Sequence, residues 1–116
     1  MIRKTLLAAI GLVTLGTAVY SAPAEAGRIT VVNNAGIVAR VKWKVDSSES
    51  GWTTLALGSS TFRDYPENYP NINLEIQFHT GFNWKSVNCN RSSLPPSRSW
   101  NVELKGTAFS FTCKAE

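Results

Sequence analysis

The sequence predicts an all-β protein: an immunoglobulin-like antiparallel β-sandwich of seven to eight strands. Apolar and polar residues alternate with a period of two in several segments, which is typical of strands with one buried face. Clusters of Gly, Pro, Asn and Ser separate these segments at short intervals. No window shows the apolar 3.6-residue repeat of an amphipathic helix. A small barrel is the alternative architecture.

The first 26 residues have the pattern of a secretory signal peptide. Two basic residues precede an apolar stretch from Leu6 to Val19, and Ala24-Glu25-Ala26 forms a small-x-small cleavage site. The apolar stretch is shorter than the roughly 20 residues that a membrane-spanning helix needs. We therefore predict cleavage after Ala26 and secretion of the product, to the outside of the cell or to the periplasm of a Gram-negative bacterium.

The predicted mature protein, residues 27–116, is long enough for one small domain. A chain of this length buries only about 60% of its unfolded surface, so its core is thin. No internal repeat, linker or low-complexity tract divides it. We therefore expect residues 1–26 to be the signal peptide and residues 27–116 to form a single β-sandwich domain.

The first half of the domain contains four predicted strands. Ile37–Val45 is the clearest, because Val41 and Trp43 share one face while Arg40 and Lys42 lie on the other. Weaker patterns predict strands at Arg28–Val32, Trp52–Leu57 and Thr61–Asp64.

The second half contains four more predicted strands. In Ile72–His79 the apolar residues Ile76 and Phe78 alternate with polar ones, as in the first half. Turn formers at Thr80-Gly81, Pro95-Pro96 and Gly106 separate the rest. The remaining strands are predicted at Trp84–Cys89, Trp100–Lys105 and Phe109–Cys113.

Cys89 and Cys113 are predicted to form a disulfide, because both lie in the domain and the exported compartment is oxidising. The bond would close a loop of about 25 residues and contribute roughly 3 kcal/mol to stability. Free thiols and a metal site are the alternatives. Two cysteines and one distant histidine, His79, make a poor zinc site, so no metal is expected.

The charge of the domain does not indicate a nucleic-acid partner. Ten Lys and Arg residues stand against seven Asp and Glu residues in residues 27–116. A nucleic-acid-binding domain usually gathers more positive charge on one face. Arg40, Lys42 and Lys44 alternate along one predicted strand, which is typical of a solvated sheet face; contact with an acidic surface is the alternative.

No constellation of residues indicates catalysis. His79 is the single histidine, and no serine near it in sequence lies in a nucleophile elbow. No glycine-rich phosphate loop and no metal-ligand spacing occur. We therefore expect no enzymatic activity and no cofactor, and a binding function is favoured.

Two aromatic residues lie at a predicted turn. Phe82 and Trp84 follow Thr80-Gly81, whereas Trp43 and Trp100 fall in the apolar phase of their strands and are predicted to be core residues. Exposed aromatic rings at a loop suit a membrane interface or the face of a sugar. The alternative is that Phe82 and Trp84 cap the end of the sandwich.

Three segments match, in order, the motifs of a known family. Pro66–Asn71 and the strand Ile72–His79 lead into Thr80-Gly81-Phe82-Asn83-Trp84, Gly36–Trp43 forms a second segment, and Gly106–Phe109 forms the third. The chain thereby resembles the C-terminal β-sandwich domain of the thiol-activated, cholesterol-dependent cytolysins. In that family a strand leads into the undecapeptide Glu-Cys-Thr-Gly-Leu-Ala-Trp-Glu-Trp-Trp-Arg. The other two segments are similar to its Gly-Ala-Tyr-Val-Ala-Gln-Phe strand and its Gly-Thr-Thr-Leu motif.

The chain departs from the family at the residues that define the family's chemistry. His79 stands in place of the undecapeptide cysteine, and Trp84 is the one tryptophan retained of three. Ala108 and Phe109 stand in place of the Thr-Leu pair that recognises cholesterol. The resemblance implies a stand-alone relative of the membrane-recognition domain, without lytic activity of its own.

The resemblance implies a secreted, non-enzymatic module that contacts a membrane, lipid or glycan surface through loops at one end. Its partner would be a membrane surface, with a sterol or a glycan head group as a candidate ligand. A secreted protein-interaction module, such as a toxin accessory, antagonist or effector, is the alternative. The residues that the resemblance places at the contacting end are Ile37, Thr80, Gly81, Phe82, Trp84, Thr107, Ala108 and Phe109.

Overall fold

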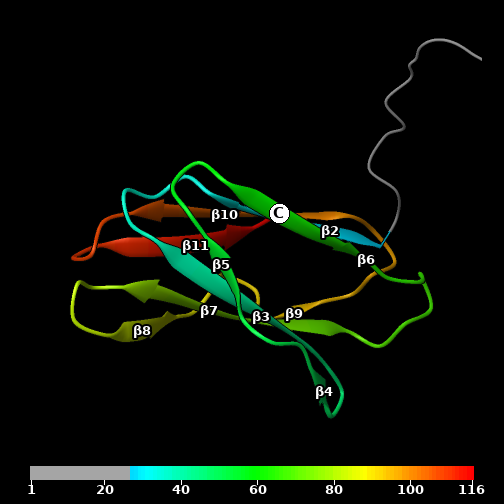
Figure 1. The fold of residues 1–116 in the computed structure, drawn as a ribbon. Helices are drawn as coiled ribbons and strands as arrows, with labels where there is room; N and C mark the ends of the chain where they lie inside the picture. The colour runs from blue at the N-terminus through cyan, green and yellow to red at the C-terminus, as the bar shows by residue number, and fades with distance from the viewer. Residues whose placement is uncertain (1–26) are drawn as a thin grey trace, which may run out of the picture.

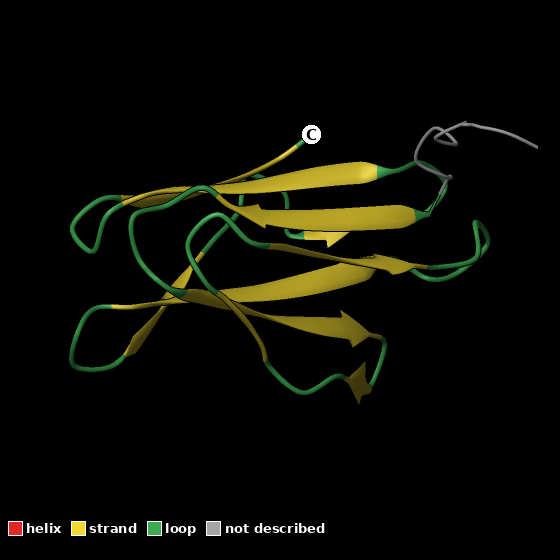
Figure 2. Ribbon diagram, turned by 45° about the horizontal axis from the view of Figure 1, so that its top comes forward, coloured by secondary structure: helices red, strands yellow, loops and turns green. Residues whose placement is uncertain are grey.

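Residues 27–116 form two β-sheets packed face to face in the computed structural model (Figure 1). The predicted signal peptide, residues 1–26, lies outside the described residues. The described part of the chain contains ten strands and no helix, and Figure 2 shows the two sheets as separate layers. The predicted all-β sandwich is confirmed.

The first sheet has four strands in the order β11-β10-β2-β6. β2 (Arg28–Asn33) pairs antiparallel with β6 (Ser60–Asp64) and in parallel with β10 (Trp100–Gly106). β11 (Phe111–Ala115) pairs antiparallel with β10 and forms one edge. The parallel pairing of β2 with β10 is the one departure in the two sheets from the antiparallel pattern expected from the sequence.

The second sheet has six strands and is built around β3 (Ala39–Val45) and β7 (Ile72–His79), which pair along the whole of β3. β8 (Trp84–Val87) pairs with the end of β7. Three short strands complete the sheet: β4 (Ser48–Glu49) and β5 (Thr53–Leu55) pair with β3, and β9 (Ser93–Leu94) pairs with β7. β4 and β9 were not predicted, because two residues are too few to show a period of two.

The core lies between the sheets and follows the predicted alternation. Trp43 and Trp100 are buried as predicted, while Arg40 and Lys42 lie on the outer side of β3. Each large apolar side chain that is fully buried stabilises the fold by about 1.5–3 kcal/mol. The buried core also contains Ile29, Val31, Ala39, Val41, Leu55, Ile72, Ile76, Leu94, Val102 and Leu104.

The last strand begins two residues later than predicted, at Phe111 instead of Phe109. Thr107 and Ser110 exchange two backbone hydrogen bonds, of 3.0 and 3.2 Å, and so close the turn between β10 and β11. Gly106 precedes this turn with φ +113°, and a Cβ atom there would lie 1.9 Å from the Ser110 carbonyl oxygen. Only glycine permits this path of the chain, which carries Phe109 out of the strand and into the turn.

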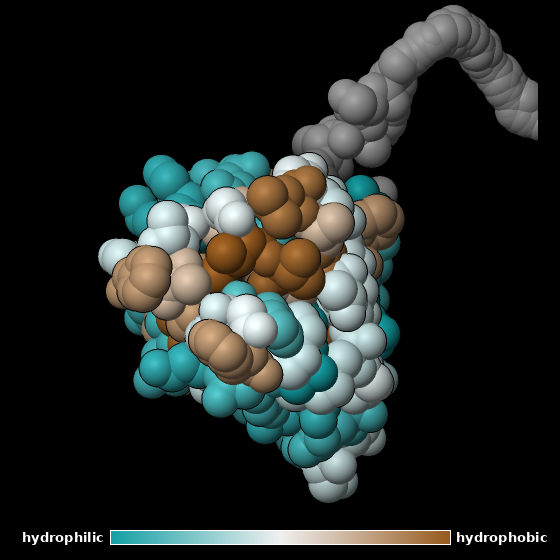
Figure 3. All heavy atoms as spheres, turned by 60° about the vertical axis from the view of Figure 1, so that its left-hand side comes forward, coloured by the Kyte–Doolittle hydropathy of each residue, from teal (hydrophilic) through white to brown (hydrophobic). Residues whose placement is uncertain are grey.

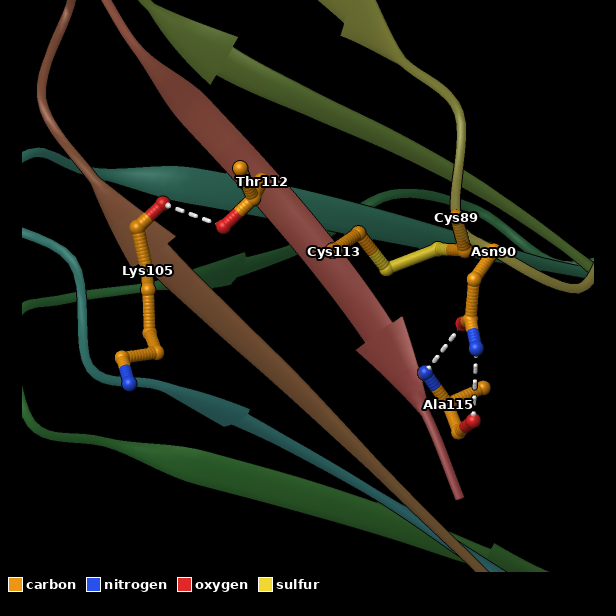
Figure 4. The surroundings of a disulfide bond; sticks show 6 residues. All are labelled: Cys89, Asn90, Lys105, Thr112, Cys113 and Ala115. Atoms are coloured by element: carbon orange, nitrogen blue, oxygen red, sulfur yellow. Dashed lines mark hydrogen bonds between the residues drawn. A yellow bond between two sulfur atoms is a disulfide. The ribbon is translucent and has the colours of Figure 1, made fainter.

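The predicted disulfide between Cys89 and Cys113 is present (Figure 4). Cys89 follows β8 in the six-stranded sheet and Cys113 lies in β11 of the four-stranded sheet, with 4.5 Å between their Cα atoms. Beside the bond, the Asn90 side chain accepts the Ala115 N–H at 2.6 Å and donates to the Ala115 carbonyl oxygen at 3.2 Å. These contacts join the two sheets along one edge.

Replacing both cysteines, in Cys89→Ala/Cys113→Ala, is expected to lower the free energy of unfolding by about 3 kcal/mol, because the unfolded chain regains the loop that the bond closes. Urea denaturation followed by tryptophan fluorescence measures this change. Reducing the wild-type protein should lower its stability by a similar amount. An unchanged unfolding midpoint in the double variant would contradict the role assigned to the bond.

Candidate functional site

Four loops meet at one end of the sandwich, which we call the tip (Figure 1, left side). They are residues 34–38, 56–59, 80–83 and 107–110, and each connects two successive strands. The first loop is bonded to the ends of the strands that carry two of the others: the Gly36 N–H donates to the carbonyl oxygen of Gly106, the last residue of β10, at 2.9 Å, and the N–H of His79, the last residue of β7, donates to the Val38 carbonyl oxygen at 3.0 Å. All eight residues predicted for the contacting end therefore lie in, or next to, these loops.

Asn33 is the buried polar residue that holds two of the tip loops together. Its side chain is fully buried, and its Nδ2 donates to the carbonyl oxygens of Ile37 and Leu55, both at 3.0 Å. Its Oδ1 accepts the Ala35 N–H at 3.0 Å. Its backbone carbonyl accepts the Gly58 N–H at 2.8 Å. Because the side chain is satisfied on both its donor and acceptor sides, it fixes the loops without the cost of a buried unpaired group.

Phe82 and Phe109 are the most exposed large hydrophobic residues of the described chain, at 95% and 100% exposure. The turns that carry them satisfy their own backbone groups. The Thr80 hydroxyl accepts the Asn83 N–H at 3.3 Å, and the Thr107 hydroxyl accepts the Phe109 N–H at 3.2 Å. The two threonines thus act inside the turns, and the two rings extend into solvent.

Other apolar side chains gather at the tip as well, and Figure 3 shows an apolar patch on this end of the molecule. A shallow hollow of about 500 Å³ lies here, and Ile37, Leu57, Gly81 and Trp84 are among the residues that line it. Leu57 is 56% exposed and was not predicted as a site residue. In the sequence, Leu57 could be recognised as an apolar residue directly before a turn glycine, Gly58. Gly58 has φ +78° and turns the chain back toward β6.

Trp84 lies at the border between the tip and the outer face of the six-stranded sheet. The guanidinium carbon of Arg40 is 4.2 Å from the centre of the Trp84 ring, and the centre of the His79 ring lies 4.9 Å from it in an edge-on arrangement. The same guanidinium lies 4.2 Å from the ring centre of Trp52. These contacts leave Trp84 half-buried, unlike the exposed Phe82 and Phe109. Ile37 and Ala108 are half-buried as well.

His79 takes part in the structure of the tip. Its Nδ1 accepts the Gly81 N–H at 3.1 Å, which holds the turn that presents Phe82. Among residues 27–116 no group of three His, Cys, Asp or Glu side chains is placed to hold a metal ion, and no helix is long and apolar enough to cross a membrane. What the tip offers is an apolar surface, with the exposed Lys85 and Lys105 on the strands next to it.

Solved structures with this fold include the membrane-binding domain of pneumolysin. The TM-score is 0.62 at 18% sequence identity, over 78% of this chain and 95% of that domain. Listeriolysin O is similar with a TM-score of 0.61 and 19% identity, and the human-specific toxin intermedilysin with 0.57 and 20%. The resemblance expected from the sequence is thus confirmed for the fold.

The similarity to the complete toxins is confined to one part of them. It covers 78% of this chain but only 22% of listeriolysin O and 23% of intermedilysin. By sequence, no family model and no curated protein matches the chain.

Replacing Asn33 by alanine is expected to lower the free energy of unfolding by about 2 kcal/mol, because buried carbonyl oxygens at Ile37 and Leu55 lose their donor. Asn34→Ala is the matched control. The Asn34 side chain is exposed and donates to Glu103 at 2.8 Å, so its loss should cost no more than about 0.5 kcal/mol. Urea denaturation measures both values, and equal losses would contradict the role given to Asn33.

Proposed function

We propose that the protein is a secreted, non-enzymatic module that binds a membrane surface through the apolar side chains of its tip. The observation that carries this proposal is that Phe82 and Phe109 are almost fully exposed at the same end of the sandwich. Exposed rings of this size do not stabilise the fold by burial. They gain free energy when they enter an interface, because their apolar surface is then removed from water. The fold supports the same function, since it is shared with a domain described as membrane-binding.

The proposed contact is a shallow insertion of the tip. Each large apolar side chain that enters the interface would contribute about 1.5–3 kcal/mol at most. Phe82 and Phe109 would enter first, followed by Leu57 and the residues that line the hollow beside it. Lys85 and Lys105 would add about 1 kcal/mol each near an anionic surface. The resulting binding is weak and reversible for a single copy.

A sterol is not required by this contact. Ala108 offers no hydroxyl group, and the Thr107 hydroxyl already accepts the Phe109 N–H at 3.2 Å. The tip therefore lacks the pair of side chains that the cytolysin resemblance assigns to cholesterol. We infer that apolar insertion and nearby positive charge drive binding, with or without a sterol in the membrane.

The basic residues on the outer face of the six-stranded sheet are already engaged within the domain. Arg40 lies between the rings of Trp52 and Trp84, and its Nε donates to Gln77 at 2.8 Å. Lys42 and Lys44 lie 3.4 and 3.5 Å from carboxylate oxygens of neighbouring strands. These contacts favour the tip over the sheet face as the binding surface. A protein partner on the sheet face is the alternative outcome of the experiments below.

Export of the domain follows from the predicted signal peptide and agrees with the disulfide. Gly27 is already part of the fold, because its N–H donates to the Arg98 carbonyl oxygen at 3.3 Å and its carbonyl accepts the Tyr65 N–H at 3.0 Å. Its φ of +89° and the approach of the Tyr65 carbonyl oxygen leave no room for a side chain. These contacts of Gly27 with the sandwich are compatible with the proposed cleavage after Ala26.

Phe82→Ser and Phe109→Ser are each expected to weaken binding to phosphatidylcholine–phosphatidylglycerol vesicles about tenfold, since a loss of roughly 1.4 kcal/mol per ring corresponds to that factor. Phe62→Ser is the matched control. Phe62 is 52% exposed but lies in β6, away from the tip. Co-sedimentation with vesicles, prepared with and without cholesterol, measures the partition. Wild-type-like pelleting of both tip variants, or an equal loss in the Phe62 variant, would contradict the proposal.

Expression in a bacterium with a general secretion pathway is expected to release a chain that begins at Gly27, because Ala24-Glu25-Ala26 presents small residues to the signal peptidase. Intact-mass spectrometry of the exported protein measures the N-terminus and shows whether the two cysteines are oxidised. A protein that keeps residues 1–26 on the membrane would refute the predicted cleavage.

A further inference from the structure

The four-stranded sheet ends in two edge strands, β11 and β6, and within residues 27–116 only β11 is covered by another segment. There the Cys113 carbonyl oxygen accepts the Asn90 N–H at 3.3 Å, and both backbone groups of Ala115 bond to the Asn90 side chain (Figure 4). β6 has β2 as its single neighbour. An uncovered edge strand is a template for pairing with another chain.

The register of β6 against β2 identifies the backbone groups that point away from the sheet. Ser59 and Tyr65 flank β6, and both are hydrogen-bonded toward β2, at 2.9 and 3.0 Å. Along an antiparallel pair, residues that bond to the neighbouring strand alternate with residues that point away from it. The N–H and C=O groups of Ser60, Phe62 and Asp64 therefore point outward, and no residue in the described part of the chain bonds to them.

The side chains of β6 leave its edge open to pairing. The strand contains no proline, and its register with β2 continues without a bulge from Ser60 to Asp64. The Asp64 carboxylate is held within its own sheet, because the Nε and Nη2 of Arg28 donate to it at 2.8 and 3.0 Å. A hollow of about 580 Å³, lined by Arg63, Tyr65 and the turn between β3 and β4, opens beside the end of the strand. The six-stranded sheet thus leaves room next to this edge.

We propose that the β6 edge pairs with the β6 edge of a second copy of this chain, antiparallel and about a two-fold axis at Phe62. In this register Phe62 lies opposite Phe62 of the second copy, and Ser60 lies opposite Asp64. Each of these opposite pairs exchanges two hydrogen bonds between N–H and C=O groups. The two four-stranded sheets become one continuous sheet. This surface is separate from the tip and goes beyond the proposed membrane contact.

The outward-facing side chains suit a second copy. Phe62 is 52% exposed, and the guanidinium carbon of Arg28 lies 4.2 Å from the centre of its ring. Two such rings opposite each other remove apolar surface from water, and aromatic pairs of this kind stabilise sheets. The Ser60 hydroxyl can donate to the Asp64 carboxylate of the second copy, since the two side chains lie on the same face of the joined strands.

Charge selects this register over its neighbours. At the two-fold axis through Phe62, Arg63 lies opposite Thr61 of the second copy, so no like charges meet. A shift by two residues in one direction places Arg63 opposite Arg63, and like charges directly opposite each other destabilise a sheet. A shift in the other direction takes Asp64 beyond the start of the opposite strand at Ser60. The strand is therefore complementary to itself in hydrogen bonding and in charge, which favours a second copy over an unrelated peptide.

Antiparallel pairing fixes the directions of the two tips. The tip loop 56–59 directly precedes β6, so the tip lies at the start of this strand. Because the paired strands run in opposite directions, the two tips of the dimer lie at opposite ends. On the basis of the proposed function, the dimer can then contact two membranes and hold them together. Each membrane still contacts one tip, so partition onto a single vesicle is set by the tip alone.

Sedimentation equilibrium and NMR of the exported protein test the pairing. We expect a dimer with a Kd on the order of 10 µM. In a mixture of ¹³C-labelled and unlabelled chains, an intermolecular NOE is expected between the Hα atoms of Thr61 and Arg63. These residues form a non-hydrogen-bonded pair in the proposed register, and the Cα atoms of such a pair are about 4.5 Å apart.

Ser60→Asp is expected to weaken the dimer about tenfold, because it places a second carboxylate opposite Asp64 at two symmetric positions. Ser60→Lys places an opposite charge there and should bind at least as tightly as the wild type. Ser86→Asp is the matched control, since Ser86 is exposed in β8 of the other sheet, and its Kd should be unchanged. Ser60→Asp should still pellet with phosphatidylcholine–phosphatidylglycerol vesicles but should lose the vesicle aggregation that the wild type shows as turbidity.

A protein that stays monomeric up to roughly 1 mM would overturn the proposal, since this concentration is far above the expected Kd. A dimer that is weakened by Phe82→Ser or Phe109→Ser but not by Ser60→Asp would also overturn it, by showing association through the tips. A wild-type dimer that binds vesicles without aggregating them would refute the opposite placement of the tips. A dimer paired through β6 that binds no vesicles would instead contradict the proposed membrane function alone.

Discussion

The closure of two small sheets over one thin layer of side chains is the constraint on which this structure depends. A domain of this size has a thin hydrophobic core. The disulfide bond between Cys89 and Cys113 therefore adds a covalent link between the two sheets at one edge of the sandwich. Asn90 adds two hydrogen bonds to the same edge. Because the sheets are fixed to each other here, the loops at both ends of the sandwich hold defined positions.

The tip shows how a small domain keeps apolar rings in water without losing its fold. The backbone groups of its turns are bonded to one another or to the hydroxyls of Thr80 and Thr107. Asn33 connects the loops from below through buried hydrogen bonds. The order of the tip therefore does not depend on burying Phe82 or Phe109, and these rings are free for an external surface.

The two ends of the sandwich differ in chemistry although the same strands reach both. β3 and β7 lead from the apolar tip to the opposite end, where a hollow is lined by residues that include Asp46, Arg63, Tyr65 and Tyr69. Between them, the charged residues on the outer face of β3 are paired with Gln77 and with carboxylates of their own sheet. These charged residues of β3 are therefore engaged within the domain, whereas Phe82 and Phe109 at the tip are almost fully exposed. A module built this way can contact a surface at one end while its other end remains accessible.

By itself, the sequence determined which residues face the core, where the long strands lie and which cysteines pair, because a period of two and an oxidising compartment are local or compositional signals. Only the tertiary structure decided the parallel pairing of β2 with β10, the short strands β4 and β9 and the exposure of Leu57. It also decided that Phe109 leaves its strand and that Arg40 partly covers Trp84. Alternation tells which face of a strand is buried but not which strand lies beside it. The neighbours of a loop residue come from segments far away in the chain, so their contacts exist only once the sheets have assembled.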